Sequence, residues 1–161
     1  MRRKASCCLL LAATITALTA TESANAASPA PPVFHSRPGS KLPFSQAVRA
    51  GDWVFASGQI GVRDDGSVPP DMAEQARLAM DHTAAALAMA GASLDDVVKC
   101  TVMLGDMRQW AAFNTVYASY FKPGRMPARS SFGASGLAFG AGVEVECLAY
   151  QPAASGAEQR P

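Results

Sequence analysis

One long segment with helical periodicity, from Asp71 to Gly91, constrains the fold more than any other part of the chain. Asp71 is typical of a helix N-cap, and Glu74 three residues later completes a start that resembles a capping box. Gly91 is a natural helix end. Small and apolar residues recur between them at spacings of three and four and predict one packing stripe: Met72, Ala76, Ala79, Thr83, Leu87 and Ala90. A helix with one such stripe needs a surface to cover it, and the flanking segments predict a β-sheet.

The flanking segments alternate between strand-like runs and one further helix. The pattern predicts strands over residues 46–50, 53–57, 96–104, 129–135 and 143–151, a turn-bearing connection over 58–70 and a second helix over 107–121. This order predicts an α+β fold, a mixed sheet with two helices on one face. Two helices cannot cover both faces of such a sheet, so the other face must be polar or contact another subunit.

The first 26 residues predict a signal peptide. Residues 2–4 form a basic start (RRK), an uncharged apolar run follows over residues 7–20, and residues 24–26 (ANA) supply a small-x-small cleavage pattern. The run is shorter than the about 20 apolar residues that a membrane span needs, so an uncleaved anchor is the less favoured alternative. We therefore expect cleavage after Ala26, a periplasmic or secreted protein, and no stable membrane association after cleavage.

The mature chain predicts one domain between two loose ends. Residues 27–38 are rich in Ala, Ser and Pro and predict an extended linker, residues 39–152 predict the domain, and residues 153–161 predict a disordered tail. The total length of 161 residues suits a single domain. Removal of the signal takes away three basic residues and one acidic residue, so the formal net charge falls from +1 to −1. That balance argues against a nucleic-acid partner.

The cysteines and histidines predict neither a metal site nor a histidine-dependent hydrolase. The two cysteines of the mature chain, Cys100 and Cys147, are far apart in sequence, and His35 and His82 have no partner at ligand spacing. We expect His82 on the solvent side of its helix. In an oxidising compartment the cysteines form either a disulfide or two buried thiols. Their apolar, strand-like surroundings favour buried thiols.

Arg129 and Glu144 are the candidate functional side chains. Arg129 begins an otherwise uncharged predicted strand, where an unpaired guanidinium is expensive to desolvate and needs an anionic partner. One interpretation is a structural ion pair with Glu144 or Glu146; the other is a fork that binds a small carboxylate substrate through two hydrogen bonds.

Glu144 and Glu146 alternate with apolar residues, so both point to one face of their strand. If that face is enclosed, their repulsion raises one carboxyl pKa, which suits an acid–base role. If the face is open to water, the two glutamates form only a solvated edge.

Six short motifs follow one another between about Leu42 and Tyr150. They are PFSQA at 43–47, SGQI at 57–60, DVVK at 96–99, NTVY at 114–117, PARS at 127–130 and VEVE at 143–146. In this order they resemble the Rid/YjgF family of reactive-intermediate deaminases, over nearly all of the predicted domain. The resemblance implies a chorismate-mutase-like α+β fold, a homotrimer whose sheets face inward, and ligand clefts between subunits.

The resemblance also implies a reaction of the 2-iminobutanoate/2-iminopropanoate deaminase type. The family hydrolyses small 2-imino acids and their enamine tautomers, such as 2-aminoacrylate, to 2-oxo acids and ammonia. Arg129 matches the arginine that holds the substrate carboxylate, and Glu144 matches the position that orients or protonates through water. Ser57 and Asn114 match positions that line the cleft. No metal, flavin or nicotinamide is expected, because the imine is already reactive and positioning supplies most of the acceleration.

Two positions near the expected ligand depart from the family pattern. Phe44 stands where many members have tyrosine, which removes one hydrogen bond of about 0.5–1.5 kcal/mol. Ser131 stands where many members have cysteine, which removes a reactive thiol. Because Arg129 is retained, we expect deaminase activity. The alternatives are a non-enzymatic carboxylate binder or holdase chaperone on the same fold, and a ribonuclease activity attributed to some members, against which the mature charge argues.

Overall fold

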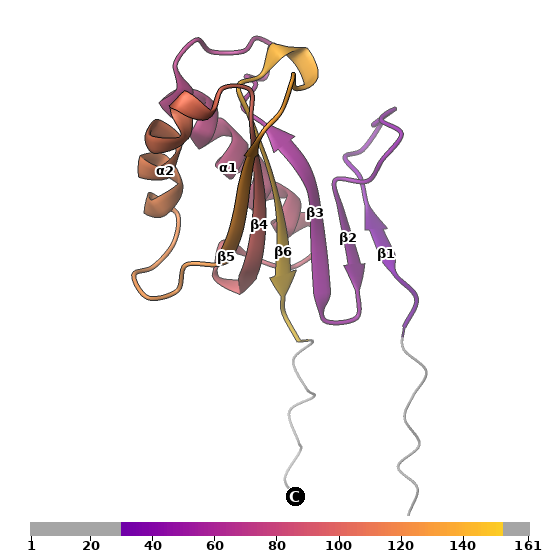
Figure 1. The fold of residues 1–161 in the computed structure, drawn as a ribbon. Coiled ribbons are helices and arrows are strands. Elements are labelled where there is room, and N and C mark those ends of the chain that lie inside the picture. The colour runs from indigo at the N-terminus through magenta and orange to yellow at the C-terminus, as the bar shows by residue number, and fades with distance from the viewer. Residues whose placement is uncertain (1–29, 153–161) are drawn as a thin grey trace, which may run out of the picture.

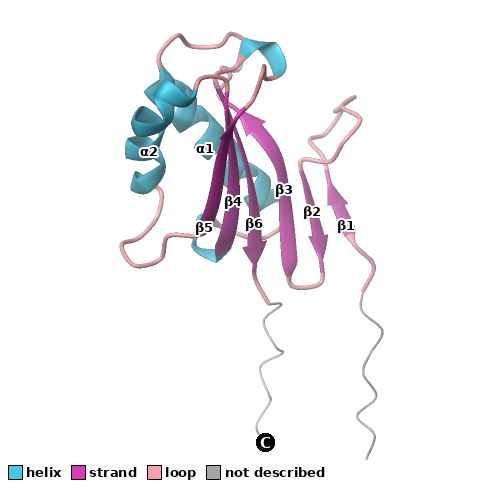
Figure 2. Ribbon diagram, in the orientation of Figure 1, coloured by secondary structure: helices cyan, strands magenta, loops and turns pink. Residues whose placement is uncertain are grey.

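The computed structural model describes residues 30–152, which form one six-stranded sheet with two α-helices on one face (Figure 1). The predicted signal peptide, the first residues of the predicted linker and the predicted tail lie outside the described residues. The elements are β1 (Val33–His35), β2 (Ala47–Ala50), β3 (Trp53–Ile60), α1 (Met72–Met89), β4 (Val97–Leu104), α2 (Trp110–Ser119), β5 (Ala128–Gly133) and β6 (Val143–Tyr150). The predicted α+β class is confirmed (Figure 2).

The sheet is mixed, with the strand order β1-β2-β3-β6-β4-β5. β4 and β5 run parallel, and every other neighbouring pair is antiparallel. The two edge strands are therefore β1 and β5, and β6, although last in the chain, lies between β3 and β4. This placement brings the C-terminal strand into the middle of the sheet.

Helix α1 forms where the apolar stripe predicts it. The Asp71 side chain accepts a hydrogen bond from the backbone N–H of Glu74 at 2.9 Å and so caps the first turn. Glu74 does not complete the reciprocal capping box, because its carboxylate pairs with Arg63 at 2.7 Å. The predicted stripe is buried against the sheet, with Ala76, Ala79 and Leu87 fully inaccessible to solvent.

The chain before residue 39 is part of the sheet, which corrects the expected boundary between linker and domain. Val33–His35 forms β1 and pairs antiparallel with β2, and the backbone N–H of Gln46 donates to the carbonyl of His35 at 2.7 Å. Alanine- and proline-rich flanks conceal this three-residue strand in the sequence. The strand is stabilised by hydrogen bonds to β2, and this pairing cannot be recognised from the composition of residues 33–35 and their neighbours.

Two other element boundaries shift for local reasons. β3 runs on from the expected end at residue 57 to Ile60, through a break in the pairing register between Ala56 and Gln59. The second helix does not begin at Met107 as expected. Asp106 caps a single 3₁₀ turn over Met107–Gln109, and α2 starts at Trp110.

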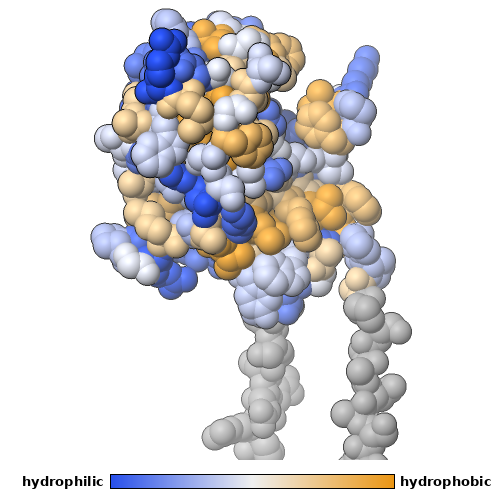
Figure 3. Space-filling model, in the orientation of Figure 1, coloured by the Kyte–Doolittle hydropathy of each residue, from blue (hydrophilic) through white to orange (hydrophobic). Residues whose placement is uncertain are grey.

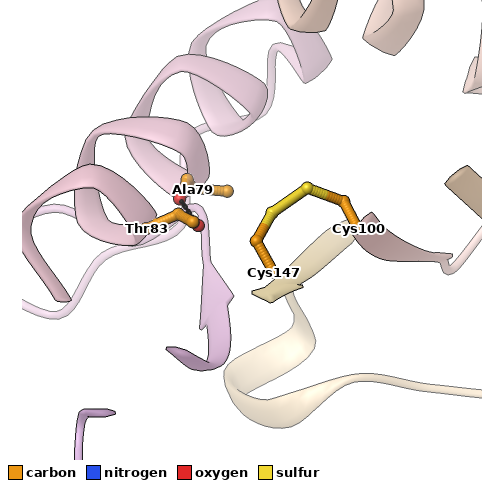
Figure 4. The surroundings of a disulfide bond; sticks show 4 residues. All are labelled: Ala79, Thr83, Cys100 and Cys147. Carbon is orange, nitrogen blue, oxygen red and sulfur yellow. Dashed lines mark hydrogen bonds between the residues drawn. A yellow bond between two sulfur atoms is a disulfide. The ribbon is translucent and has the colours of Figure 1, made fainter. Parts of the chain in front are cut away.

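Cys100 and Cys147 form a disulfide, so the expectation of two buried thiols is wrong (Figure 4). The two residues are direct partners across the antiparallel pair β4–β6, and their Cα atoms are 4.1 Å apart. Antiparallel partners at this separation place their side chains close together on one face. The bridge lies in the core beneath α1, near Ala79 and Thr83, and joins the neighbouring strands β4 and β6.

The face of the sheet opposite the helices is rich in exposed apolar side chains. The large ones are Phe34, Trp53, Phe55, Phe132 and Tyr150, each at least 41% exposed. Hydrophobic side chains gather over β6, β3 and β2 in the lower part of the view in Figure 3. Of the two expected options for this face, the polar one is wrong. A contiguous exposed apolar face is typical of a surface that another molecule covers. Among residues 30–152, no helix is long and apolar enough to span a membrane.

We expect replacement of both bridge cysteines by alanine to lower the free energy of unfolding by about 2–4 kcal/mol, because the bridge closes a loop between residues 47 positions apart. Denaturant unfolding followed by circular dichroism measures this difference. As a control, the difference between wild type and variant shrinks when unfolding is measured with a thiol reductant present. Equal midpoints without reductant would contradict the stabilising role.

Candidate functional site

Arg129 lies on the helix-covered face of the sheet, at the edge strand β5. In the pairing register it is the neighbour of Cys100, which is itself the partner of Cys147. Neighbours in register point to the same face of a sheet, so the Arg129 side chain points toward the helices. Its guanidinium carbon lies over the rings of three α2 residues, 4.6 Å from the centroid of Tyr117, 5.8 Å from Phe113 and 5.9 Å from Trp110.

The structural ion pair considered for Arg129 is wrong. Glu144 is the partner of Met103, and Glu146 is the partner of Thr101; both glutamates thus point to the uncovered face. The sheet itself separates them from the guanidinium. Within the described part of the chain, no carboxylate lies within ion-pair distance of Arg129. Its charge is compensated instead by the aromatic faces of α2 and by partial exposure to solvent.

A hollow of about 320 Å³ opens beside Arg129, between α2 and the start of β5. Its lining is otherwise uncharged and comprises Asn114, Tyr117, Ala118, Met126 and Pro127. A guanidinium on an uncharged wall leaves its N–H donors available for an anion of matching geometry. The sequence predicts Asn114 and Arg129 in one site, and the structure brings them together here.

Three buried polar atoms on α2 and β5 have no hydrogen-bond partner among residues 30–152: Asn114 Oδ1 and the Tyr117 hydroxyl, whose residues line the hollow, and Ser131 Oγ. Asn114 lies one turn before Tyr117 on α2, and Ser131 follows Arg129 by two positions on the same face of β5. Buried polar atoms are normally paired, and an unpaired cluster beside a cation indicates a place for a polar ligand or water. Burial raises the pKa of Tyr117 to about 12 despite the nearby Arg129 charge, so its hydroxyl keeps its proton and can donate.

A larger hollow of about 410 Å³ lies on the uncovered face and is lined by residues that include Phe55, Ser57, Lys99 and Glu146. This hollow contains both a cation, Lys99, and a carboxylate, Glu146, and Lys99 Nζ donates to the Ser130 hydroxyl at 2.7 Å. The hollow at Arg129 is the better anion site, because its cation has no carboxylate beside it.

Glu144, Ser57 and Phe44 form a second group, away from Arg129. The Glu144 carboxylate packs against the Cα of Gly58 so closely that a Cβ there would overlap Oε1, which explains the glycine in the SGQI motif. The Ser57 hydroxyl donates to the Ser45 carbonyl at 2.7 Å, so it holds the segment that carries the half-exposed Phe44. Ser57 thus uses its donor within the fold, at the segment that carries Phe44.

Partial burial raises the pKa of Glu144, and the negative charge of Glu146 raises it further. The sequence predicts the shared face of the two glutamates, and the structure confirms it. The raised pKa was expected from charge repulsion on an enclosed face, whereas burial of Glu144 is the larger cause here. Among the described residues, no three His, Cys, Asp or Glu side chains lie close enough to hold a metal ion together. His82, expected on the solvent side, is only partly exposed and its Nδ1 lies 3.1 Å from the Ile60 carbonyl.

Sequence reasoning missed the aromatic side chains that surround Arg129. Trp110, Phe113 and Tyr117 recur at helical spacing within the predicted second helix, a pattern that indicates only a packing face. Phe113 and Tyr117 are buried, as that prediction requires, while Trp110 remains 43% exposed. The available signal was a polar or amphipathic ring, tyrosine or tryptophan, on a face otherwise assigned to the core.

We expect Glu146→Gln to lower the pKa of Glu144 while leaving it above the ordinary glutamate value, because burial is the larger cause and persists in the variant. A ¹³C NMR titration of the side-chain carboxyl measures the midpoint. Since folding raises this pKa, Glu144 stabilises the folded state below the ordinary value of 4.5, and that contribution is lost as the pH rises through the folded-state pKa. An unchanged midpoint would show that the two carboxylates do not interact.

Comparison with known proteins identifies the family. The family model described as endoribonuclease L-PSP matches residues 34–151. The chain is 38% identical over 112 residues to the mitochondrial protein mmf2 of Schizosaccharomyces pombe, which covers 68% of this chain and 88% of that protein. It is 36% identical over 111 residues to 2-iminobutanoate/2-iminopropanoate deaminase of Mus musculus, which covers 68% and 82%.

A solved structure agrees with the sequence relatives. The crystal structure of Escherichia coli TdcF with bound serine superposes with a TM-score of 0.65 at 34% sequence identity, over 70% of this chain and 91% of that chain. The fold, the order of the motifs and the extent of the match lead to one conclusion. The chain belongs to the family described as endoribonuclease L-PSP, which is the Rid/YjgF family that its motifs resemble.

Proposed function

We propose that the protein hydrolyses small 2-imino acids and their enamine tautomers, of the 2-aminoacrylate and 2-iminopropanoate type, to 2-oxo acids and ammonia. The observation that carries the proposal is the Arg129 guanidinium, which faces an uncharged hollow with no carboxylate beside it and with unpaired polar atoms around it. A monocarboxylate substrate fits this arrangement, because its charge pairs with the fork in two parallel hydrogen bonds. The relative from Mus musculus is named for this reaction.

In the proposed mechanism Arg129 fixes the substrate carboxylate, and Asn114 and Ser131 bind polar atoms of the substrate or water beside it. A water molecule attacks the imine carbon and forms a carbinolamine. The C–N bond then breaks as protonated Glu144 delivers its proton to the leaving nitrogen, which departs as ammonia. The carbinolamine hydroxyl returns a proton to Glu144 as it becomes the carbonyl of the 2-oxo acid. The raised pKa of Glu144 favours its protonated form, which this step needs. No redox change occurs, so the reaction requires no electron-transferring cofactor.

The proposed site is shared between protomers of a homotrimer. Arg129 and Glu144 point to opposite faces of one sheet, so a single chain does not present both to one small substrate. A neighbouring chain can supply the second group where its Glu144 and Phe44 approach the Arg129 hollow. The exposed apolar face supports the same assembly, because inward-facing sheets would bury its aromatic side chains.

The two departures from the family pattern leave this mechanism in place. Ser131 keeps a hydroxyl where many members have a thiol, and its Oγ is one of the unpaired buried atoms beside Arg129. Phe44 keeps the aromatic ring without the phenolic hydroxyl, and its segment is held by Ser57. We propose that these changes alter substrate preference and not the reaction type.

We expect Arg129→Ala to lower kcat/KM for an enzymatically generated 2-imino acid by about 10²–10³-fold, because two charge-assisted hydrogen bonds to the carboxylate are lost. Arg129→Lys should retain part of the activity, since lysine keeps the charge and loses the fork. Arg125→Ala is the matched control, because the Arg125 guanidinium donates to the Asp95 backbone carbonyl at 3.2 Å and does not line the hollow. Full activity of Arg129→Ala would reject the assigned role, and binding without turnover would favour the non-enzymatic carboxylate binder.

We also propose that the mature protein is exported to the periplasm or secreted. The Cys100–Cys147 disulfide supports this location, since such bridges persist in oxidising compartments and are rare in reducing ones.

We expect expression of the full chain in a Gram-negative host to place the protein outside the cytoplasm, with an N-terminus at Ala27 and the disulfide intact. Cell fractionation followed by intact-mass measurement checks all three. A chain that still carries residues 1–26 in the cytoplasmic fraction would contradict export.

A further inference from the structure

The Arg129 guanidinium is oriented by an aromatic ring and by no acid among residues 30–152. Of the three α2 rings near it, that of Tyr117 is by far the nearest, with 4.6 Å between the guanidinium carbon and the ring centroid. A carboxylate in this place would occupy the N–H donors that a substrate needs. An aromatic face attracts the planar cation without using those donors, so the fork stays oriented and free.

The Tyr117 ring is itself held rigidly. It packs between Phe113 and Phe121, at centroid separations of 5.5 and 4.9 Å, and the residue is only 5% exposed. A ring fixed on both sides by core aromatics gives the guanidinium a fixed platform. This location explains why an otherwise mobile side chain on an edge strand can be pre-positioned.

The Tyr117 hydroxyl is not used by the fold. It is buried and has no hydrogen-bond partner among the described residues, although Tyr120 on the same helix pairs its own hydroxyl with Asp81 at 2.8 Å. Tyr117 lines the hollow together with Arg129, so the residue borders the proposed carboxylate position. A buried donor without a partner is costly unless a ligand or water completes it.

We propose that Tyr117 is a positioning and specificity-determining residue of the site: its ring orients the Arg129 fork, and its hydroxyl donates a third hydrogen bond to the bound carboxylate. The inference rests on the proposed function for the identity of the substrate. The inference adds Tyr117 to the proposed site, as a residue that contacts both the Arg129 side chain and the bound carboxylate. The ring acts through Arg129 and therefore on orientation, whereas the hydroxyl acts on affinity.

The test uses the mature full-length protein and three variants, with 2-oxobutanoate as the carboxylate probe in calorimetric titrations and a 2-imino acid in kinetics. Tyr117→Phe keeps the ring and removes the hydroxyl, so we expect about tenfold weaker 2-oxobutanoate binding and a raised KM with kcat nearly unchanged. Tyr117→Leu also removes the ring and should lower kcat in addition. Tyr120→Phe is the matched control and should bind 2-oxobutanoate within twofold of wild type.

Each result has a defined meaning. Wild-type affinity in Tyr117→Phe would overturn the role of the hydroxyl, and equal kinetics of the Phe and Leu variants would overturn the role of the ring. A purely structural role would lower the melting temperature of Tyr117→Phe without changing its affinity. If wild type binds 2-oxobutanoate and Tyr117→Phe weakens that binding while no variant or wild type turns over imino acids, the proposed reaction is wrong and this inference stands. No binding by wild type would overturn it.

Discussion

The register between β4 and β6 is the constraint on which the rest of the structure depends. It places Cys100 opposite Cys147, so these two neighbouring strands are joined by a covalent bond inside the core. This register sends Glu144 toward the uncovered face, and the adjoining β4–β5 register sends Arg129 toward the helices. A shift of one residue in either strand would exchange these faces and place charged side chains in the core.

Within residues 30–152, the protein stabilises the partly buried Arg129 cation without an ion-paired carboxylate. Arg129 lies over the rings of α2, and its surroundings contain unpaired polar atoms in place of a salt bridge. A carboxylate partner within the fold would occupy the N–H donors of Arg129, and a substrate could then not bind them. Aromatic rings offset the cost of burying the positive charge less than a carboxylate would, so an anion that binds Arg129 gains additional favourable interaction energy. This is the physical basis for interpreting the hollow as a substrate site.

The two faces of the sheet have different roles in this interpretation. The helix-covered face contains the core, the disulfide and Arg129, and the other face carries exposed aromatic side chains together with the paired glutamates. Because Arg129 and Glu144 lie on opposite faces of the sheet, the proposed site needs a second subunit, and the exposed apolar face is the proposed contact surface for it. A monomer would leave both the aromatic face and the site incomplete.

The sequence alone determined the features that depend on neighbours along the chain. The capped helix α1, the alternation that puts Glu144 and Glu146 on one face, and the family motifs around Arg129 were all predicted correctly. Local periodicity contains this information because each pattern spans only a few residues.

Only the tertiary structure decided which distant residues meet. It paired Cys100 with Cys147, added β1 to the sheet, separated Arg129 from both glutamates and placed Tyr117 beneath the guanidinium. Each of these contacts depends on strand order and pairing register across long sequence separations. Those are set by how the whole core packs, and no local pattern in the chain encodes them.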